Sequence, residues 1–178
     1  MSGAVAVAAV VAISACSGPE PPEESPSAQP SASESTDPQA LLDEAARLFD
    51  QYWAAILEMT EERSSDPALL RSIANEEVAR AAAESVDLSI AGGVVPSSTP
   101  TVTLFEADGV PSPDGFAVSV CTDPASTSPV TLEGAPVPLP GDAEDVPWTL
   151  ALGPHPDATG LWIVGLTAAD REAEACSP

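Results

Sequence analysis

Apolar residues recur every three or four positions along residues 38–63, which is the spacing of an amphipathic α-helix. Asp37 followed by Pro38 predicts the start of this helix, because aspartate caps free backbone N–H groups and proline suits the first turn. The apolar positions are Leu41, Ala45, Leu48, Phe49, Tyr52, Trp53, Ile56, Leu57 and Met59. The spacing predicts one long helix with a broad apolar face.

Two shorter helices are expected next along the chain. Asp66 and Pro67 repeat the cap-and-proline order and predict a short helix as far as Ala74. Asn75 is a candidate cap for a third helix, which the glycine pair at 92–93 ends because glycine accepts a left-handed backbone. The apolar side of this third helix consists of Val78, Ala82, Val86 and Ile90.

Beyond the glycine pair the apolar period changes from that of a helix to the alternation typical of β-strands. The predicted strands are residues 101–106, 116–122, 130–132, 148–152 and 161–166, with the proline-rich residues 133–147 as a loop. Helices followed by four or five antiparallel strands indicate an α+β domain over residues 38–178. With 44% hydrophobic residues, the chain has enough apolar side chains for one packed core.

The N-terminal residues have a different pattern. Residues 4–14 are small, apolar and uncharged, too short for a membrane span of about 20 residues but typical of the core of a secretory signal. Ile13-Ser14-Ala15-Cys16 follows at the end of this run and resembles the lipobox of bacterial lipoproteins. The resemblance implies a signal peptide over residues 1–15, a diacylglycerol on Cys16, and a location at the extracytoplasmic face of the cell membrane. The alternative is a buried hydrophobic helix.

Residues 16–37 are predicted to form a disordered tether. Residues 17–37 contain five prolines, six serines and five acidic residues, with no basic or aromatic residue. Such a composition buries too little apolar surface to offset the entropy of ordering the chain. Fully extended at about 3.1 Å per residue, this segment would reach roughly 65 Å.

The charge of the chain excludes several function classes. It has 28 acidic residues, five arginines, no lysine and a net charge of −23. A P-loop needs a lysine, and nucleic-acid binding needs a basic surface, so neither is expected. The folded domain should be repelled by anionic membranes, so membrane contact is expected only through lipid on Cys16. A protein or small-molecule partner is expected to be basic or cationic, because complementary charge speeds association.

The three cysteines divide into one anchor and one pair. With Cys16 assigned to lipid, Cys121 and Cys176 are expected to form a disulfide outside the cytoplasm. The bridge would close a loop of about 55 residues and stabilise the fold by about 4 kcal/mol in the chain-entropy model. The alternative is a redox or metal pair, which the lack of a CxxC spacing and of a nearby histidine disfavours.

The order of elements resembles the NTF2-like fold, and more narrowly secreted actinobacterial lipoproteins of that superfamily. The residues that carry the resemblance are Cys121-Thr122-Asp123 at the end of a strand, Gly160-Leu-Trp162-Ile-Val164 in the last strand, and Cys176. It implies a curved sheet that wraps a long helix into a cone with an internal pocket. This fold hosts isomerases, dehydratases, ligand binders and interaction modules, so it does not decide the function.

The sequence contains no catalytic constellation. His155 is the only histidine and lies between two prolines in a predicted turn, and no serine sits in a Gly-x-Ser-x-Gly elbow. Helical spacing directs most of Glu58, Glu61 and Glu62 to solvent. No catalytic residue and no cofactor are therefore predicted.

Two groups are weaker candidates for binding. Asp142, Glu144 and Asp145 offer oxygen ligands for Ca²⁺ but lack the EF-hand order, so a solvated acidic loop is favoured and no metal is predicted. Four aromatic residues would either line the pocket of the cone or pack the core: Tyr52, Trp53, Trp148 and Trp162.

The sequence therefore predicts a lipid-anchored extracytoplasmic domain that binds a ligand or a partner without catalysis. One alternative is an isomerase or hydrolase that uses an Asp or Glu base in the pocket. Another is a structural acidic protein of the cell surface. A buried, unpaired carboxylate beside an open pocket would favour the enzyme. A closed, fully packed cone with an exposed apolar patch would favour partner binding, and a solid core with neither pocket nor patch would leave the structural role.

Overall fold

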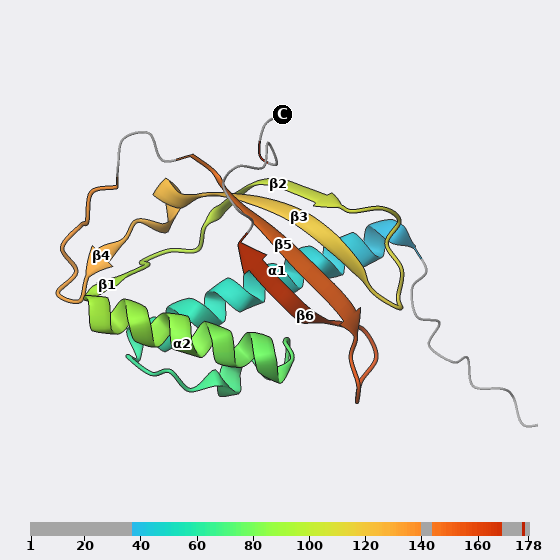
Figure 1. Ribbon diagram of the computed structural model, residues 1–178, viewed down its shortest axis with the longest axis horizontal. Coiled ribbons are helices and arrows are strands. Elements are labelled where there is room, and N and C mark those ends of the chain that lie inside the picture. The colour runs from blue at the N-terminus through green and yellow to red at the C-terminus, as the bar shows by residue number, and fades with distance from the viewer. Residues whose placement is uncertain (1–36, 140–143, 169–175, 177–178) are drawn as a thin grey trace, which may run out of the picture. The chain divides into compact units, whose positions relative to one another are not determined.

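The computed structural model describes residues 37–139, 144–168 and 176 and confirms the α+β class. The predicted signal peptide, Cys16 and the tether up to residue 36 lie outside these residues. The helices are α1 (Pro38–Glu61) and α2 (Glu76–Gly92), with 3₁₀ helices η1 (Pro67–Leu69) and η2 (Pro124–Thr127). The strands are β1 (Val94–Val95), β2 (Thr101–Ala107), β3 (Phe116–Asp123), β4 (Val130–Thr131), β5 (Val146–Pro154) and β6 (Leu161–Ala168) (Figure 1).

Side-chain caps start the helices where the sequence places them. The carboxylate of Asp37 accepts a hydrogen bond from the backbone N–H of Gln39, and the amide oxygen of Asn75 accepts one from Val78. Gly93 ends α2 with a left-handed backbone (φ 74°). The long amphipathic helix and the third predicted helix are therefore confirmed.

The short helix expected to reach Ala74 is reduced to the three residues of η1. The reason is a contact with a distant part of the chain. Ile163 donates its backbone N–H to the carbonyl of Ile73 at 2.8 Å, and Asn75 donates to the carbonyl of Ile163 at 2.9 Å. Residues 73–75 therefore pair with β6 instead of continuing a helix, and they cover part of its edge.

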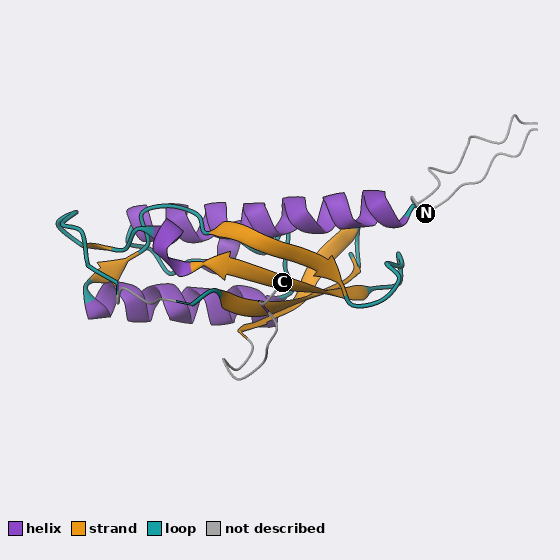
Figure 2. Ribbon diagram, turned by 90° about the horizontal axis from the view of Figure 1, so that it is seen from above, coloured by secondary structure: helices purple, strands orange, loops and turns teal. Residues whose placement is uncertain are grey.

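Four strands form one antiparallel sheet in the order β2-β3-β5-β6, and β1 pairs with β4 in a separate two-stranded sheet. β5 begins at Val146, inside the predicted loop, because Thr122 and Val146 extend the pairing of β3 with β5. β1 was not predicted. Figure 2 shows α1 running alongside the strands of the four-stranded sheet, and α2 packs against the C-terminal half of α1.

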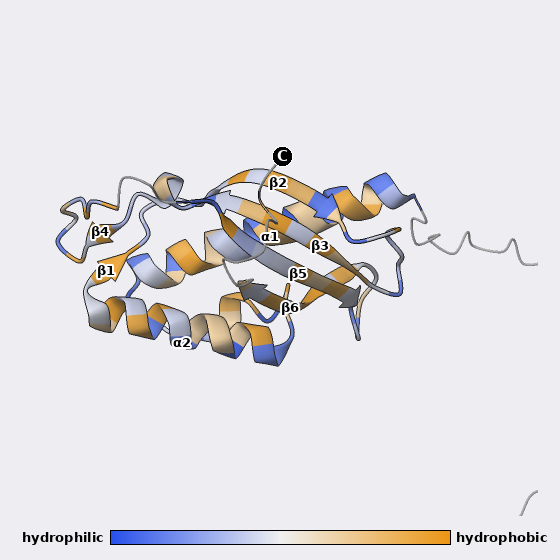
Figure 3. Ribbon diagram, turned by 45° about the horizontal axis from the view of Figure 1, so that its top comes forward, coloured by the Kyte–Doolittle hydropathy of each residue, from blue (hydrophilic) through white to orange (hydrophobic). Residues whose placement is uncertain are grey.

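The apolar residues form two clusters. The first joins the N-terminal half of α1 to the inner face of the sheet, and the second joins the C-terminal half of α1 to α2. The largest buried residues of the first are Phe49, Leu150, Ile163, Val118 and Val120, and the second consists of Ala55, Ile56, Met59, Leu70, Ala79, Ala82, Ala83 and Val86. Hydrophobic and hydrophilic bands alternate along both helices (Figure 3).

The hairpin between β5 and β6 is fixed to α1 by one carboxylate. Glu44 accepts a hydrogen bond from the backbone N–H of Leu161 at 3.0 Å. Gly160 precedes it with a φ of 104°, and a Cβ atom there would lie 2.7 Å from the carboxylate oxygen of Glu44. The left-handed backbone angle favours glycine at this position, and a larger residue would push the Glu44 carboxylate away from Leu161.

Within the part of the chain that the structure describes, no helix has both the length and the apolar character needed to cross a membrane.

Candidate functional site

A cavity of about 450 Å³ lies beside the second cluster, between α1, α2 and the ends of β5 and β6. Cavities of this size hold small organic ligands in other proteins. The described residues that line it are Tyr52, Trp53, Ile56 and Thr60 of α1; Val78, Ala81, Ala82, Ser85, Val86 and Ser89 of α2; and Val94, Val95, Pro96, Thr127, Pro129, Trp148 and Leu166 from the strands and loops. The wall is thus mainly aliphatic and aromatic.

Three of the four predicted aromatic residues meet at this cavity. The rings of Tyr52 and Trp53 lie edge-to-face with centroids 5.9 Å apart, and those of Trp53 and Trp148 lie 6.0 Å apart at 84°. Trp53 also contacts Phe49 of the first cluster edge-to-face at 6.4 Å. These rings are partly buried, so they pack the core and present a wall to the cavity at the same time.

Three of the hydroxyl groups on the wall donate hydrogen bonds within the protein. Thr60 donates to the carbonyl of Ile56 at 2.7 Å, Ser89 to that of Ser85 at 3.0 Å, and Thr127 to that of Pro124 at 2.8 Å. A hydroxyl oxygen that has donated still carries lone pairs. These hydroxyls therefore offer acceptors to a bound molecule.

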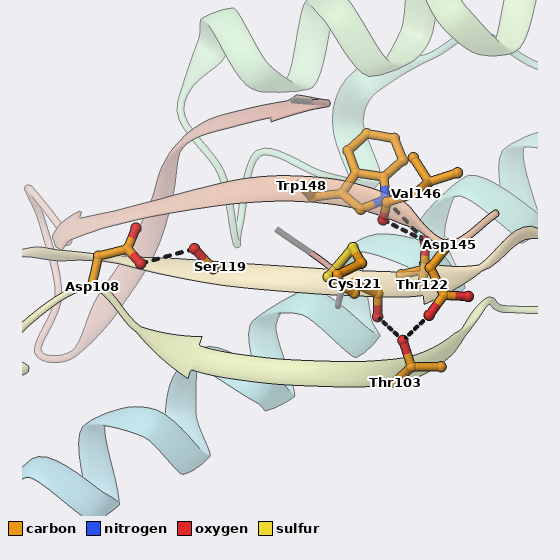
Figure 4. Close-up of a disulfide and its surroundings, with 9 residues drawn as sticks. Thr103, Asp108, Ser119, Cys121, Thr122, Asp145, Val146 and Trp148 are labelled. Carbon is orange, nitrogen blue, oxygen red and sulfur yellow. Dashed lines mark hydrogen bonds between the residues drawn. A yellow bond between two sulfur atoms is a disulfide. The ribbon is translucent and has the colours of Figure 1, made fainter. Parts of the chain in front are cut away.

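Two indole N–H groups differ in their partners. That of Trp148 donates to the hydroxyl of Thr122 at 3.0 Å, as Figure 4 shows. That of Trp53 is buried and has no hydrogen-bond partner among the described residues. A buried donor without a partner costs about 1–3 kcal/mol.

Tyr52 is the one titratable residue among the described lining residues. Burial raises its pKa to about 12, because the phenolate would lose its hydration. The phenol is therefore neutral at physiological pH and cannot act as a general base. The described part of the wall contains no carboxylate, histidine or arginine.

The cavity opens to solvent along one edge of α2. Ala81 and Ser85 line it and are themselves exposed, as is Val94 at 40%. Leu88 follows Ser85 by three residues and is 74% exposed. Residues three or four apart lie together on a helix surface, so Leu88 borders the mouth.

Trp162, the fourth predicted aromatic, lies on the other face of the sheet. Its neighbours Leu161 and Ile163 are buried in the first cluster, and side chains alternate along a strand. Its ring packs against that of His155 with centroids 5.0 Å apart. His155 lies in the hairpin turn, half-buried by this contact, and its Nδ1 accepts the backbone N–H of Asp157 at 3.1 Å.

The remaining acidic candidates lie on the surface. Glu58, Glu61, Glu62 and Glu144 are exposed, and Asp145 accepts a hydrogen bond from the hydroxyl of Thr103 at 2.5 Å. Asp142 lies outside the described residues. Where the structure describes the chain, no three His, Cys, Asp or Glu side chains are grouped to hold a metal ion.

Cys121 and Cys176 form the predicted disulfide, with Cα atoms 5.7 Å apart and 55 residues of separation. Cys121 is 1% exposed and alternates with Val120, so it faces away from the helices. Figure 4 shows the bridge beside Thr103, which also donates to the carbonyl of Cys121 at 3.3 Å. A buried structural disulfide is typical of proteins outside the cytoplasm.

A scan of the chain against models of known protein families finds no match, and neither does a search of curated proteins.

Sequence reasoning expected a pocket only through the NTF2-like resemblance, and it missed the contribution of α2 to the wall and the hydrogen bond between Trp148 and Thr122. The cavity depends on the separation of two helices, which apolar periodicity does not encode. A signal for its location is present in α2, where the lining residues Ala82 and Ser85 are small.

Proposed function

We propose that the protein is a lipid-anchored, extracytoplasmic binding domain that holds a small apolar ligand in this cavity without transforming it. The observation that carries the proposal is a cavity of about 450 Å³ with an aliphatic and aromatic wall, whose described residues include no carboxylate or histidine. Binding sites for small molecules commonly combine such a wall with a few placed polar groups.

The proposal includes the NTF2-like assignment. A four-stranded antiparallel sheet with a long helix on one face and a hollow beside that helix is what the resemblance leads one to expect. It also retains the order of signal peptide (1–15), lipidated Cys16 with a tether (16–37) and binding domain (38–178). The buried disulfide supports an extracytoplasmic location for that domain.

The chemistry of the wall favours binding over catalysis. An isomerase or hydrolase in this cavity would need a base aimed at its substrate, and the titratable residue in the described wall is a phenol that stays neutral. A purely structural coat protein would have no use for the open edge beside Ala81 and Ser85. Ligand binding is consistent both with a wall whose one titratable described residue stays neutral and with the open edge beside Ala81 and Ser85.

The test of binding uses the full-length chain carrying Cys16→Ala, so that no lipid on Cys16 competes for the cavity. N-phenyl-1-naphthylamine, a neutral apolar fluorophore, is titrated into the protein. We expect a saturable fluorescence increase that corresponds to one site. An increase that never saturates, or none at all, would contradict the proposal.

Two matched variants locate the site. Ser85 lines the cavity at its mouth and is exposed, so Ser85→Trp fills the entrance without overpacking the core. We expect it to lower the affinity for the fluorophore by about tenfold or more, which is 1.4 kcal/mol or more. Ala91→Trp adds the same ring to an exposed position of α2 that is not among the lining residues, and should leave the affinity unchanged.

The anchor is tested separately by feeding cells an alkyne analogue of palmitate. The wild-type chain should become labelled and partition into detergent, and Cys16→Ala should do neither. Cys176→Ala is the control for loss of a different cysteine and should keep the label. Labelling that survives Cys16→Ala would refute the lipid anchor.

A further inference from the structure

The cavity has no cationic group to receive an anion from the described residues. All four described arginines are held elsewhere. Arg47, Arg71 and Arg80 form ion pairs with Glu44, Glu76 and Glu84, and Arg63 donates to the carbonyl of Leu132 at 3.1 Å. A carboxylate that entered the cavity would lose its hydration without gaining an ion pair, which is strongly unfavourable.

Three hydroxyl groups on the wall favour a cation over an anion as well. The hydroxyls of Thr60, Ser89 and Thr127 have already donated to backbone carbonyls, so each presents acceptor lone pairs. Acceptors match a ligand that donates N–H groups. Aromatic faces such as those of Trp53 and Trp148 also attract cations through their quadrupoles.

The rim beside the mouth is acidic. Glu77 lies four residues before Ala81 and Glu84 three residues after it, so both carboxylates neighbour Ala81 on the surface of α2. Glu84 is paired with Arg80 at 2.7 Å, whereas Glu77 has no ion pair with the described residues. The chain as a whole carries a net charge of −23, so at low salt it attracts cations and repels anions.

From these observations we infer that the ligand is a cationic amphiphile: an amine on an apolar body, with the body in the cavity and the ammonium group facing the wall hydroxyls and the acidic rim. Fatty acids and other apolar anions of the same size are rejected. The inference rests on the proposed function, because it specifies which ligands the same cavity accepts.

The experiment compares three competitors that share one apolar body. Dodecylamine, 1-dodecanol and dodecanoate are each used below their aggregation concentration to displace N-phenyl-1-naphthylamine from the full-length Cys16→Ala protein at pH 7. At this pH the amine is protonated and the carboxylic acid ionised, as their protein counterparts are. We expect the amine to bind most tightly and the carboxylate most weakly, with about a tenfold or larger difference between them at 20 mM salt.

Added salt and two variants test whether electrostatics cause the expected order of affinities, with the amine first and the carboxylate last. Raising the salt to 0.5 M should shrink the ratio of amine to carboxylate affinity, because screening weakens the field at the mouth. Glu77→Gln should lower the ratio about two- to threefold. Glu58→Gln removes one exposed carboxylate of α1 that is not among the lining residues, and should leave the ratio unchanged.

Failure of the charge preference and failure of ligand binding give different results in these experiments. If the fluorophore binds but the carboxylate displaces it as well as the amine does, the charge preference is overturned and the proposed function stands. A ratio that salt leaves unchanged would overturn the charge preference in the same way. If the fluorophore does not bind at all, the proposed function fails and this inference fails with it.

Discussion

The two apolar clusters of the domain share α1 but are filled differently. Around the N-terminal half of α1, large side chains such as Phe49 and Leu150 interlock with the sheet and are 0–1% exposed. Around its C-terminal half, four of the eight buried residues are alanines, and the cavity lies beside them. The first cluster, where α1 meets the sheet, is therefore the packed end of the domain. The second cluster, where α1 meets α2 beside the cavity, is its hollow end.

The difference follows from the size of the side chains at the contact. Large residues on both surfaces of the packed end leave no space, and close packing is the normal state of a protein interior. The small residues of α2 cannot fill the space enclosed by Ile56, Trp53 and Trp148. We therefore expect the packed end to supply stability and the hollow end to supply binding.

The largest expected effect is at the packed end. Phe49→Ala should lower the free energy of unfolding by about 3–5 kcal/mol, because it removes a fully buried ring and leaves a cavity. Val86→Ala at the hollow end should cost only about 1–2 kcal/mol, since its methyl groups already border open space. Urea unfolding followed by tryptophan fluorescence measures both, and equal losses would remove the distinction between the two ends.

The disulfide is the next largest contributor. It closes a loop of 55 residues and joins β3 at Cys121 to Cys176. Reduction, or the double variant Cys121→Ala/Cys176→Ala, should lower the free energy of unfolding by about 2–4 kcal/mol. Because Cys121 faces away from the helices, affinity for N-phenyl-1-naphthylamine should persist in the fraction that stays folded. Loss of binding without loss of stability would show that the two ends are coupled.

Deprotonation of Tyr52, whose ring packs against both clusters, should lower the free energy of unfolding at alkaline pH by a smaller amount. Tyr52 is the only tyrosine in the chain, so the ultraviolet absorbance of the phenolate reports on this residue alone. Its pKa is about 12 in the folded state against 10.0 when unfolded, so the unfolded state loses its proton first. Stability should therefore be unaffected below about pH 10 and fall by about 2 kcal/mol as the pH rises from about 10 to 12.

Tyr52→Phe is the control for this prediction. It keeps the ring and removes the titrating group, so the loss of stability between about pH 10 and 12 should become smaller by the same amount. A phenol that titrates near its ordinary pKa would mean that the cavity end is more open to water than its geometry indicates.

The helices could be predicted because their signals are local. Asp37 and Asp66 precede prolines, and both cap the following turn as expected. The same signal is present at Asp123 and Pro124, where Asp123 accepts the backbone N–H of Ala125 at 2.8 Å and starts η2. The repeated dipeptide therefore carried enough information to place that turn, although the strand pattern alone did not predict it.

Features that depend on distant contacts could not be predicted. Residues 73–75 leave the helical path because Ile163, about 90 residues later, offers a pairing edge. The cavity likewise depends on the distance between α1 and α2. The position of Trp162 could have been predicted from the alternation of side chains along a strand. Leu161 and Ile163 on either side face the core, so Trp162 faces the opposite side of the sheet.

The claim that the hollow end binds and the packed end does not is tested most directly by nuclear Overhauser effects. The full-length Cys16→Ala protein is labelled at its methyl groups and saturated with N-phenyl-1-naphthylamine. The account predicts contacts from the ring protons of the fluorophore to the methyls of Ala82 and Val86, and none to those of Val118 and Leu150. Contacts to Val118 and Leu150, or to exposed methyls alone, would contradict it.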